Sequence, residues 1–355
     1  MIEQTFEFDN ESLVQWFGDE QRDLPWRRSL DPYAVWVSEV MLQQTQVSVV
    51  IPYFERWMAQ FPTIQSLATA PLDAVLKAWE GLGYYSRARH LHAGAQMVLE
   101  NYGGRVPDDP KELAKIKGLG PYTIGAIRSF AFHHKAAAVD GNVIRVIARY
   151  FAIEEDMGRP SSVQKIHKAV NGLLPDHEPW VVSEALIELG AVVCAKKPKC
   201  SVCPLKKTCS GYRLGIGASL PKKLKKVKYE SLSRSVAVVS CQGALLVRRC
   251  AAGEVMRDLY EFPYCDNEQD VKKEPIDALK KFLLETHLLD VTYKETLPEV
   301  SHSFTRFRVK LLPFLFKSRK LTSTAIWQWV PVEELAKLPF SSGHRRIFDH
   351  FSHRA

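Results

Sequence analysis

The stretch IKGLGPYTIGAI (residues 116–127) decides the fold class of the first part of the chain. Gly118 and Gly120 flank one leucine, a proline follows, and apolar residues then resume at helical spacing. This pattern predicts a tight turn between two helices over residues 111–132. The backbone N–H groups of such a turn suit a phosphate oxygen, because glycine allows close approach. The pattern is typical of a helix–hairpin–helix that grips a nucleic-acid backbone, and an ordinary corner between two helices is the alternative.

Proline residues mark the predicted helix starts on either side of this turn. Asp31-Pro32 has the form of an N-cap and a first helical residue, and the apolar residues after it predict one helix through Tyr53. Pro110 and Pro121 open two further helices in the same way. This part of the chain is therefore predicted to be mostly α-helical.

The segment PKKLKKVKYE (221–230) separates the helical part from a region with a different pattern. It is rich in lysine and has few apolar side chains to bury, so we expect a basic linker. The predicted domains are a helical domain over residues 1–220 and a smaller α+β domain over residues 231–355.

Beyond the linker, short apolar runs predict a sheet. SVAVVS (235–240), a Gln-Gly turn and ALLVRR (244–249) predict a β-hairpin. Residues 307–316 and 325–330 predict further strands, and residues 275–289 have helical spacing.

Composition and charge narrow the class of protein. The chain has 355 residues, of which 46% are hydrophobic, and a net charge of +8, which favours a polyanionic partner. No apolar run reaches the length of a membrane span, and the polar start MIEQTFEFDNESL differs from a signal peptide. We expect a monomeric protein of the cytoplasm, with no membrane partner.

Four of the seven cysteines crowd into a short basic loop. Their spacing, C-x5-C-x2-C-x5-C, suits either tetrahedral zinc or a 4Fe–4S cluster, and the single C-x2-C pair is closer to a cluster held on one compact loop. A metal with four protein ligands would be structural, and the lysines of the loop would form a phosphate-contact surface. The candidate ligands are Cys194, Cys200, Cys203 and Cys209.

Two acidic residues, Glu39 and Asp140, have opposite surroundings. Glu39 lies in AVWVSEVMLQQTQVSVV. If that helix is buried on all sides, burial raises the pKa of Glu39 and makes it a proton donor; on an exposed face it would be an ordinary surface carboxylate. Asp140 precedes a predicted helix, where an N-cap role alone explains it, but we also expect the helix N-terminus to lower its pKa. One proton donor and one charged carboxylate are the pair that glycosidic cleavage requires.

Together these segments resemble the endonuclease III superfamily of DNA glycosylases and, within it, the MutY family of adenine DNA glycosylases. The matching stretches are RDLPWR (22–27), WVSEVMLQQTQV (36–47), WEGLGYYSRARHLH (79–92), GLGPYTIGAI (118–127), VDGNVIRV (139–146) and SEALIELG (183–190). The first cysteine gap, in CAKKPKC, is one residue shorter than is usual in the family. The resemblance implies a 4Fe–4S cofactor and, as substrate, double-stranded DNA with adenine opposite 8-oxoguanine or guanine. It also implies the bacterial cytosol or nucleoid as the location.

The resemblance implies roles for particular residues. Glu39 matches the acid that protonates adenine, and Asp140 matches the carboxylate that stabilises the cationic sugar. Tyr122 replaces a lysine that attacks the sugar in relatives that cut the strand, which implies weak or no lyase activity because a phenol forms no imine. Asn142 and Tyr122 match residues beside the reaction centre, and Arg22, Trp26 and Glu184 match residues that surround a flipped adenine. Gln44 and Tyr84 match side chains that enter the base stack. Gly118 and Gly120 match the positions that contact the phosphates.

The second domain resembles the Nudix-like domain with which this family recognises 8-oxoguanine. HSFTRF (302–307) aligns with the lesion-contact loop, where Phe304 and Thr305 are candidate contacts and Thr305-Arg306 replaces the usual Ser-His. A Nudix hydrolase needs a glutamate-rich helix that binds metal ions. The segment ALKKFLLETHLL (278–289) contains one acidic residue, Glu285, so we expect no pyrophosphohydrolase activity.

Two other functions agree with parts of the sequence. One is an enzyme of the same fold that removes mismatched thymine or uracil, although Glu39 within SEVMLQQTQV and the second domain argue against it. The other is a non-catalytic DNA-binding protein that uses the hairpin and the cysteine loop for structure or redox sensing. A substitution of Glu39 separates the second alternative from an enzyme, because a binding protein would keep its function.

Overall fold

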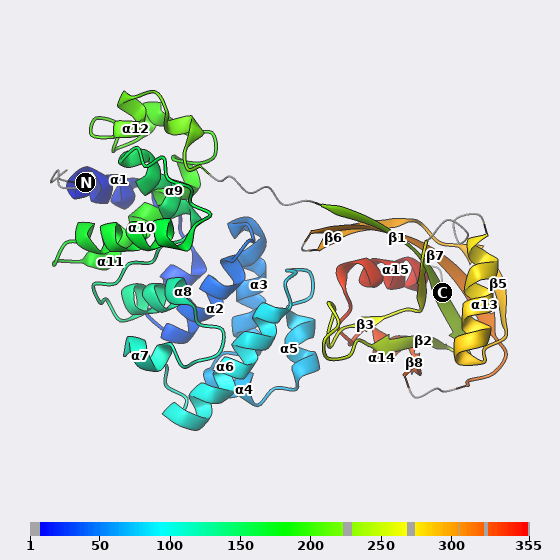
Figure 1. Cartoon of the computed structure of the whole chain (residues 1–355). Helices are drawn as coiled ribbons and strands as arrows, with labels where there is room; N and C mark the ends of the chain where they lie inside the picture. The colour runs from blue at the N-terminus through cyan, green and yellow to red at the C-terminus, as the bar shows by residue number, and fades with distance from the viewer. Residues whose placement is uncertain (1–7, 223–228, 268–273, 305, 323–325, 354–355) are drawn as a thin grey trace. The chain divides into compact units, whose positions relative to one another are not determined.

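The protein was analysed as a computed structural model, shown in Figure 1. It describes residues 8–222, 229–267, 274–304, 306–322 and 326–353.

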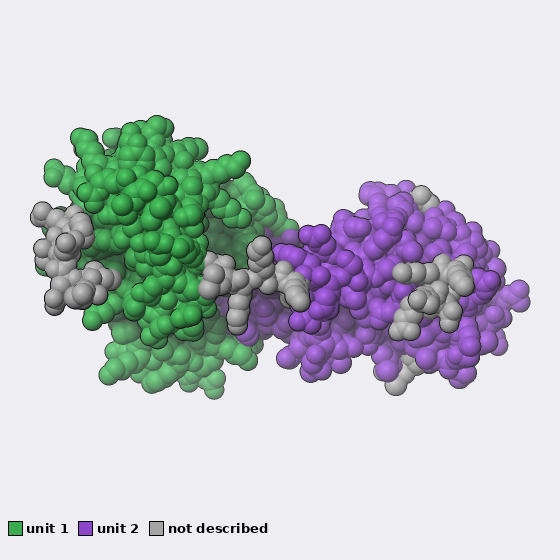
Figure 2. Space-filling view, turned by 45° about the horizontal axis from the view of Figure 1, so that its top comes forward, with its two compact units in different colours: residues 1–68, 93–226 green, residues 69–92, 227–355 purple. Residues whose placement is uncertain are grey.

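The chain divides into two compact units, which Figure 2 shows in different colours. Unit 1 comprises Met1–Ala68 and Ala93–Lys226, and unit 2 comprises Thr69–His92 and Val227–Ala355. Residues 69–92 thus lie inside the range predicted for the helical domain but group with unit 2. Contacts within unit 2 account for this grouping. For example, the Glu80 carboxylate accepts hydrogen bonds from the Phe340 backbone N–H and the Arg345 Nε, both at 2.9 Å.

Unit 1 is built from helices joined by turns (Figure 1). Its α-helices are α1 (Asn10–Glu20), α2 (Pro32–Leu42), α3 (Val47–Gln60), α4 (Ile64–Ala68), α7 (Pro110–Leu113), α8 (Pro121–Ala126), α9 (Gly141–Tyr150), α10 (Pro160–Leu173), α11 (Pro179–Val192), α12 (Ser210–Arg213) and the part of α6 (Ser86–Tyr102) that follows His92. The short 3-10 helices are η1 (Pro25–Arg27), η3 (Cys200–Val202) and η4 (Gly217–Ser219), and η2 (Ile127–Ala131) is a π-helical turn.

The single helix predicted from Pro32 to Tyr53 is wrong, because the chain breaks between α2 and α3. Gln44, in the break, has a left-handed backbone with φ of 59°, which an α-helix cannot contain. The break brings Gln44 to the rim of the cavity described below.

The helix starts predicted at Pro110 and Pro121 are confirmed. Asp109 caps the first of them by accepting a hydrogen bond from the Lys111 backbone N–H at 2.6 Å. Between the two helices Gly118 has φ of 89°, a conformation that favours glycine. After α8 the helix widens into the π-helical turn η2, which places Phe130 in the wall of the cavity.

Apolar side chains of α1, α9, α10 and α11 form a shared core in unit 1. The apolar residues of α9 recur at helical spacing, so Val143, Val146, Ile147 and Tyr150 are buried against the neighbouring helices. This core fixes the start of α9, where Asp140 lies.

Unit 2 contains an eight-stranded sheet with α-helices on both faces (Figure 1). The sheet follows the order β3-β2-β1-β7-β5, with β4 paired to β1, β6 to β7 and β8 to β2; β1 and β7 are parallel, and the other pairs are antiparallel. The strands are β1 (Glu230–Cys241), β2 (Ala244–Arg249), β3 (Tyr260–Glu261), β4 (Tyr264–Asp266), β5 (Val291–Thr296), β6 (Val300–Phe304), β7 (Phe307–Ser318) and β8 (Gln328–Pro331). The helices are α13 (Pro275–His287), α14 (Val332–Leu335), α15 (Ser342–Ser352), α5 (Leu72–Ala78) and the first part of α6.

Alternating residues of β1 supply two cores. Val236 and Val238 pack towards α14 and α15, and Ala237 and Val239 pack towards α13. The predicted hairpin and the predicted helix over 275–289 are confirmed, with α13 ending at His287. The linker prediction falls mostly on residues 223–228, and part of the strand predicted over 325–330 falls on residue 325; these lie outside the described residues. In the described part of the chain, no helix has the length and apolar character to cross a bilayer.

Candidate active site

One cavity of about 460 Å³ in unit 1 is lined by all four predicted catalytic residues and by four of the predicted substrate-binding residues. Its walls come from the segment before α2, from α2, from the starts of α8 and α9, and from α11. The residues named from the sequence that line it are Arg22, Trp26, Glu39, Gln44, Tyr122, Asp140, Asn142 and Glu184.

Glu39 enters this cavity from a buried helix. All residues of α2 from Tyr33 to Met41 are buried, and Glu39 is 5% exposed. Burial raises the pKa of the Glu39 carboxyl to about 7; a hydrogen bond from Tyr122 opposes this shift, and the negative charge of Asp140 adds to it. Of the two surroundings that the sequence left open for Glu39, the structure shows the buried one, so Glu39 can hold a transferable proton near neutral pH.

Tyr122 is the direct partner of Glu39. It follows the Gly120-Pro121 start of α8, and its hydroxyl donates a hydrogen bond to Glu39 Oε2. Burial and the neighbouring carboxylates hold the pKa of Tyr122 well above its usual value, so the phenol stays neutral. Tyr122 therefore orients the carboxyl of Glu39 as a hydrogen-bond donor.

Asp140 caps the N-terminus of α9. Its carboxylate accepts hydrogen bonds from the backbone N–H groups of Asn142 and Val143, both at 2.8 Å, and from Asn142 Nδ2 at 2.7 Å. The N-cap prediction is confirmed.

The predicted lowering of the Asp140 pKa is wrong, because burial outweighs these hydrogen bonds and raises it. The sequence revealed the helix start but not the packing that buries it. The three donors still stabilise the charged form of Asp140, and the cavity therefore joins a proton donor to a carboxylate held by amide groups.

Asn142 accepts a hydrogen bond from Arg145, an arginine that was not predicted from the sequence as a site residue. Arg145 Nη2 donates to Asn142 Oδ1 at 2.7 Å, and Arg145 Nε donates to the Cys194 carbonyl at 2.7 Å. Gly190 makes room for this arrangement, because a Cβ there would lie 2.6 Å from Asn142 Cβ. The arginine stands in VDGNVIRV three residues after Asn142, at the i+3 spacing of one helix face.

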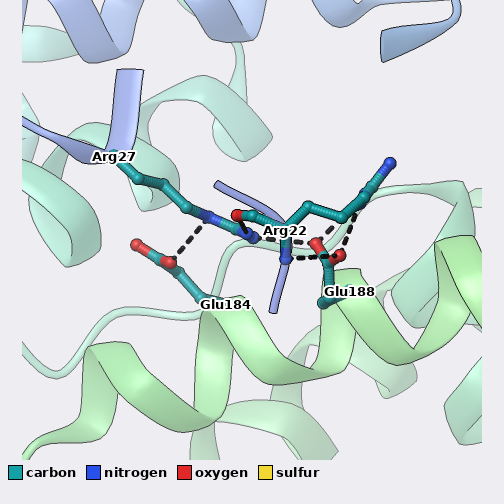
Figure 3. Close-up of polar contacts among 4 residues, drawn as sticks. All are labelled: Arg22, Arg27, Glu184 and Glu188. Atoms are coloured by element: carbon teal, nitrogen blue, oxygen red, sulfur yellow. Dashed lines mark hydrogen bonds and ion pairs between the residues drawn. The ribbon is translucent and has the colours of Figure 1, made fainter. Parts of the chain in front are cut away.

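Two arginines and two glutamates form an ion-pair network at the cavity wall (Figure 3). Arg27 Nε lies 3.1 Å from Glu184 Oε2, and Arg27 Nη2 lies 3.0 Å from Glu188 Oε2. Arg22 Nε donates to Glu188 Oε1 at 2.5 Å. The sequence reading named Arg22 and Glu184 but missed Arg27 and Glu188. The signal for Glu188 was the i,i+4 spacing of Glu184 and Glu188 on the mostly apolar helix of SEALIELG.

The two glutamates of this network differ in electrostatic state. Burial raises the pKa of Glu184, with Arg27 opposing the shift and Glu188 adding to it. Burial alone would also raise the pKa of Glu188, but the hydrogen bonds and charges of Arg22 and Arg27 bring it below its usual value. Glu188 is thus the permanent anion of the network.

Gln44 and Tyr84, the two residues predicted to enter the base stack, both have a left-handed backbone conformation. Gln44 has φ of 59° and Tyr84 has φ of 48°, values that cost energy for residues other than glycine. Gln44 lines the cavity, whereas Tyr84 is not among its lining residues and belongs to unit 2, where it is 45% exposed. Strained backbone of this kind is concentrated at functional sites.

The four cysteines of the loop line a common cavity of about 230 Å³. The buried Arg149 of α9 braces the loop by donating to the carbonyls of Cys194 (3.1 Å) and Ala195 (2.6 Å), and its Nη1 lies 3.4 Å from Cys194 Sγ. Within the described part of the chain, none of these four cysteines forms a disulfide. Among the residues that the structure describes, no three His, Cys, Asp or Glu side chains form a group that could hold a metal ion.

In unit 2, Phe304 ends strand β6 and packs beside Phe307, with ring centroids 5.4 Å apart. Arg306 Nε lies 3.1 Å from Glu230 Oε1. Thr305 lies outside the described residues.

Comparison with known proteins gives the family of the chain. Residues 37–172 match the HhH-GPD superfamily of base excision DNA repair proteins, and residues 235–350 match the NUDIX domain. The adenine DNA glycosylase of Buchnera aphidicola subsp. Schizaphis graminum is 31% identical over 324 residues, which cover 89% of this chain and 91% of that protein. The chain belongs to the adenine DNA glycosylase family. The predicted fold class, a helical glycosylase core followed by a Nudix-like domain, is confirmed.

Within this family, similarity is stronger but shorter to animal members. The adenine DNA glycosylase of Rattus norvegicus is 45% identical over 217 residues, which cover 58% of this chain and 42% of the rat protein. The match therefore spans less than half of that relative. Among solved structures, a thermostable thymine-DNA glycosylase has 28% identity and a TM-score of 0.53, covering 59% of this chain and 97% of that one.

Proposed function

We propose that the protein hydrolyses the N-glycosidic bond of adenine in double-stranded DNA where adenine lies opposite 8-oxoguanine or guanine. One observation carries the proposal: the buried Glu39, with its pKa near 7, shares a cavity with the N-capping carboxylate of Asp140. Because the glycosidic bond is poorly accessible inside a duplex, the adenine must first leave the base stack and enter this cavity.

The cavity residues then have distinct roles in the reaction. Glu39 transfers its proton to the adenine ring, so that the base leaves as a neutral molecule and takes the bonding electrons with it. The charge of Asp140 stabilises the cationic sugar that remains. Water then adds to the sugar and gives up one proton to the ionised Glu39, which completes the hydrolysis and restores the acid. Tyr122 orients Glu39, and Asn142 orients Asp140.

A single-turnover assay with three duplexes tests this proposal. The expected order of rates is adenine opposite 8-oxoguanine, then adenine opposite guanine, with no release of thymine opposite guanine. Faster release of thymine would favour the mismatched-thymine alternative, to which the similarity with thymine-DNA glycosylase also points. Tight binding of all three duplexes without base release would favour a non-catalytic DNA-binding protein.

The proposal includes a 4Fe–4S cluster on the loop 194–209. The support is chemical: four cysteines line one cavity of about 230 Å³, and their spacing has a single C-x2-C pair with longer arms, which is closer to a cluster held on one compact loop than to zinc. When bound, the cluster would supply cross-links that keep this lysine-rich loop folded. Cys194, Cys200, Cys203 and Cys209 would hold it.

We further propose that unit 2 reads the base opposite the adenine, with Phe304 as a stacking side chain. Phe304 is partly buried at the end of β6, and Arg306, two residues later, has a side chain that is 58% exposed. An aromatic ring with a nearby cation is a common arrangement for contact with a base and a phosphate.

In unit 1, Gly118 and Gly120 are proposed contacts for the phosphate backbone, since a Cβ at Gly120 would meet no atom within 4 Å.

The rate of adenine excision is expected to depend on pH through Glu39. Since the protonated carboxyl is the reactive form and its pKa is about 7, the rate should be constant at lower pH and fall about tenfold per pH unit above that value. The hydrogen bond from Tyr122 lowers this pKa, so Tyr122→Phe should move the falling limb to higher pH. Single-turnover rates between about pH 6 and about pH 9 measure both profiles. A flat profile for the parent would contradict the assignment of Glu39.

Tyr122→Lys is expected to create covalent trapping that the parent lacks. A lysine amine beside Glu39 could attack the sugar carbon to give an imine, whereas the phenol of Tyr122 cannot. Borohydride reduction during excision, followed by denaturing electrophoresis, detects the protein–DNA adduct. Tyr122→Phe is the matched control and should give no adduct. Efficient trapping by the parent would show that another lysine attacks the sugar and that the protein is not monofunctional.

A further inference from the structure

Glu188 is the most buried member of the charged network in Figure 3. Its side chain is 0% exposed, whereas that of Glu184, one turn earlier on α11, is 22% exposed. The Glu188 carboxylate accepts hydrogen bonds from Arg22 Nε (2.5 Å), Arg22 Nη2 (3.1 Å) and Arg27 Nη2 (3.0 Å). Both of its oxygens are therefore occupied by arginine donors.

These bonds attach one wall of the cavity to α11. Arg22 and Arg27 are the ends of a short segment. A hydrogen bond joins these ends, since Arg27 Nη1 donates to the Arg22 carbonyl at 3.1 Å. Leu24 and Trp26, inside this segment, line the cavity. Glu188 thus connects the wall that carries Trp26 to the helix that carries Glu184.

Arg27 is shared between two carboxylates with different exposure. Its Nη2 is held by the fully buried Glu188, while its Nε lies 3.1 Å from Glu184 Oε2. Without the charge of Glu188, Arg22 would lose the ion pair that it makes with this residue, and Arg27 would keep its ion pair with Glu184. Loss of one partner from a buried ion pair leaves an uncompensated charge and shifts its neighbours.

We propose that Glu188 is a positioning residue, which holds Arg22, Trp26 and Arg27 in the geometry that receives a purine base flipped out of the duplex. It acts through the two arginines, since its own oxygens are occupied by them. The inference rests on the proposed function. It predicts a defect in capture of the base and not in binding of the DNA backbone, because a preorganised pocket lowers the cost of receiving the base.

Glu188→Gln tests this inference, because it keeps the shape of the side chain and removes its charge. We expect single-turnover excision of adenine to slow by at least about tenfold, since small displacements of positioning groups have effects of this size or larger. Affinity for a duplex that contains a stable abasic analogue should stay within about twofold of the parent, because that duplex offers no base to capture. A duplex with 2-aminopurine in place of adenine measures capture directly, and its fluorescence rise on binding should be reduced.

Two controls separate positioning from general damage. Glu155→Gln removes the acceptor of an exposed ion pair with Lys165 elsewhere in unit 1 and should change neither measurement. Adding Arg22→Gln to Glu188→Gln should slow adenine excision by a smaller factor than Arg22→Gln does in the parent, because both changes disrupt one network. If Glu188→Gln does not fold, Arg22→Gln alone should show the same pattern in weaker form, since the side chain of Arg22 is 36% exposed.

Each outcome decides between the inference and its alternatives. Excision and fluorescence equal to those of the parent would overturn the positioning role. Parallel loss of excision and of abasic-duplex affinity would also overturn it, in favour of a purely structural role. Absence of adenine excision by the parent would instead contradict the proposed function, and the 2-aminopurine signal would still test Glu188.

Discussion

Replacing Glu39 by glutamine is expected to slow adenine excision by roughly a thousandfold, because the amide keeps the size and hydrogen bonding of the carboxyl but has no proton to transfer. Affinity for the adenine-containing duplex should change by less than about threefold, since Glu39 is buried in the cavity and is not part of the surface that meets the phosphates. Single-turnover rates and equilibrium binding to the same duplex are the two measurements.

A stability measurement shows whether the Glu39→Gln variant is intact. Burial raises the pKa of Glu39 from its ordinary value of 4.5 to about 7, so the folded protein resists ionisation of this carboxyl. The free energy of unfolding of the parent should therefore decrease as pH rises through about 7, and the glutamine variant should lack this component. A folded variant that still excises adenine at a rate near that of the parent would contradict the role of Glu39 as the acid.

Features that depend on a few consecutive residues were predictable from the sequence. Pro110 and Pro121 mark helix starts, and Asp140 caps α9, because capping and the fixed φ of proline act within one turn of chain. Burial of Glu39 was open from the sequence alone, and the packing of α2 on all sides decided it.

Features that depend on distant partners were not predictable in the same way. The pKa of Asp140 rises because other helices bury the start of α9, and no local pattern announces this desolvation. Glu188 and Arg22 are 166 residues apart in sequence, so neither motif indicates that the other supplies its ion-pair partner. The break at Gln44 was hidden because the flanking residues on both sides have apolar helical spacing. The non-helical residues 43–46, among them Gln44 with its left-handed backbone, separate α2 from α3.

The second large effect is expected at the cysteine loop, where Cys203→Ser should abolish metal incorporation and weaken duplex binding by at least about tenfold. The parent is expected to be brown and to contain about four iron and about four sulfide per chain. A hydroxyl is a poor ligand for iron, so the serine variant loses one of four attachment points. Iron and sulfide analysis, visible absorbance and equilibrium DNA binding measure the three consequences.

Electrostatics link ionised thiols in this loop to a bound metal group. Burial raises the pKa of the Cys203 thiol to about 11, and nearby thiols add to the shift, so this cavity disfavours thiolates unless a positively charged metal group accompanies them. Cys265→Ser is the matched control, since that thiol lies on β4 of unit 2, outside the loop, and its loss should leave iron content and DNA binding unchanged. Stoichiometric zinc in a colourless parent protein, made with ample iron, would contradict the cluster. Unchanged iron content in Cys203→Ser would exclude this thiol as a ligand. The cluster would then not explain how the five lysines of the loop are positioned for contact with phosphates.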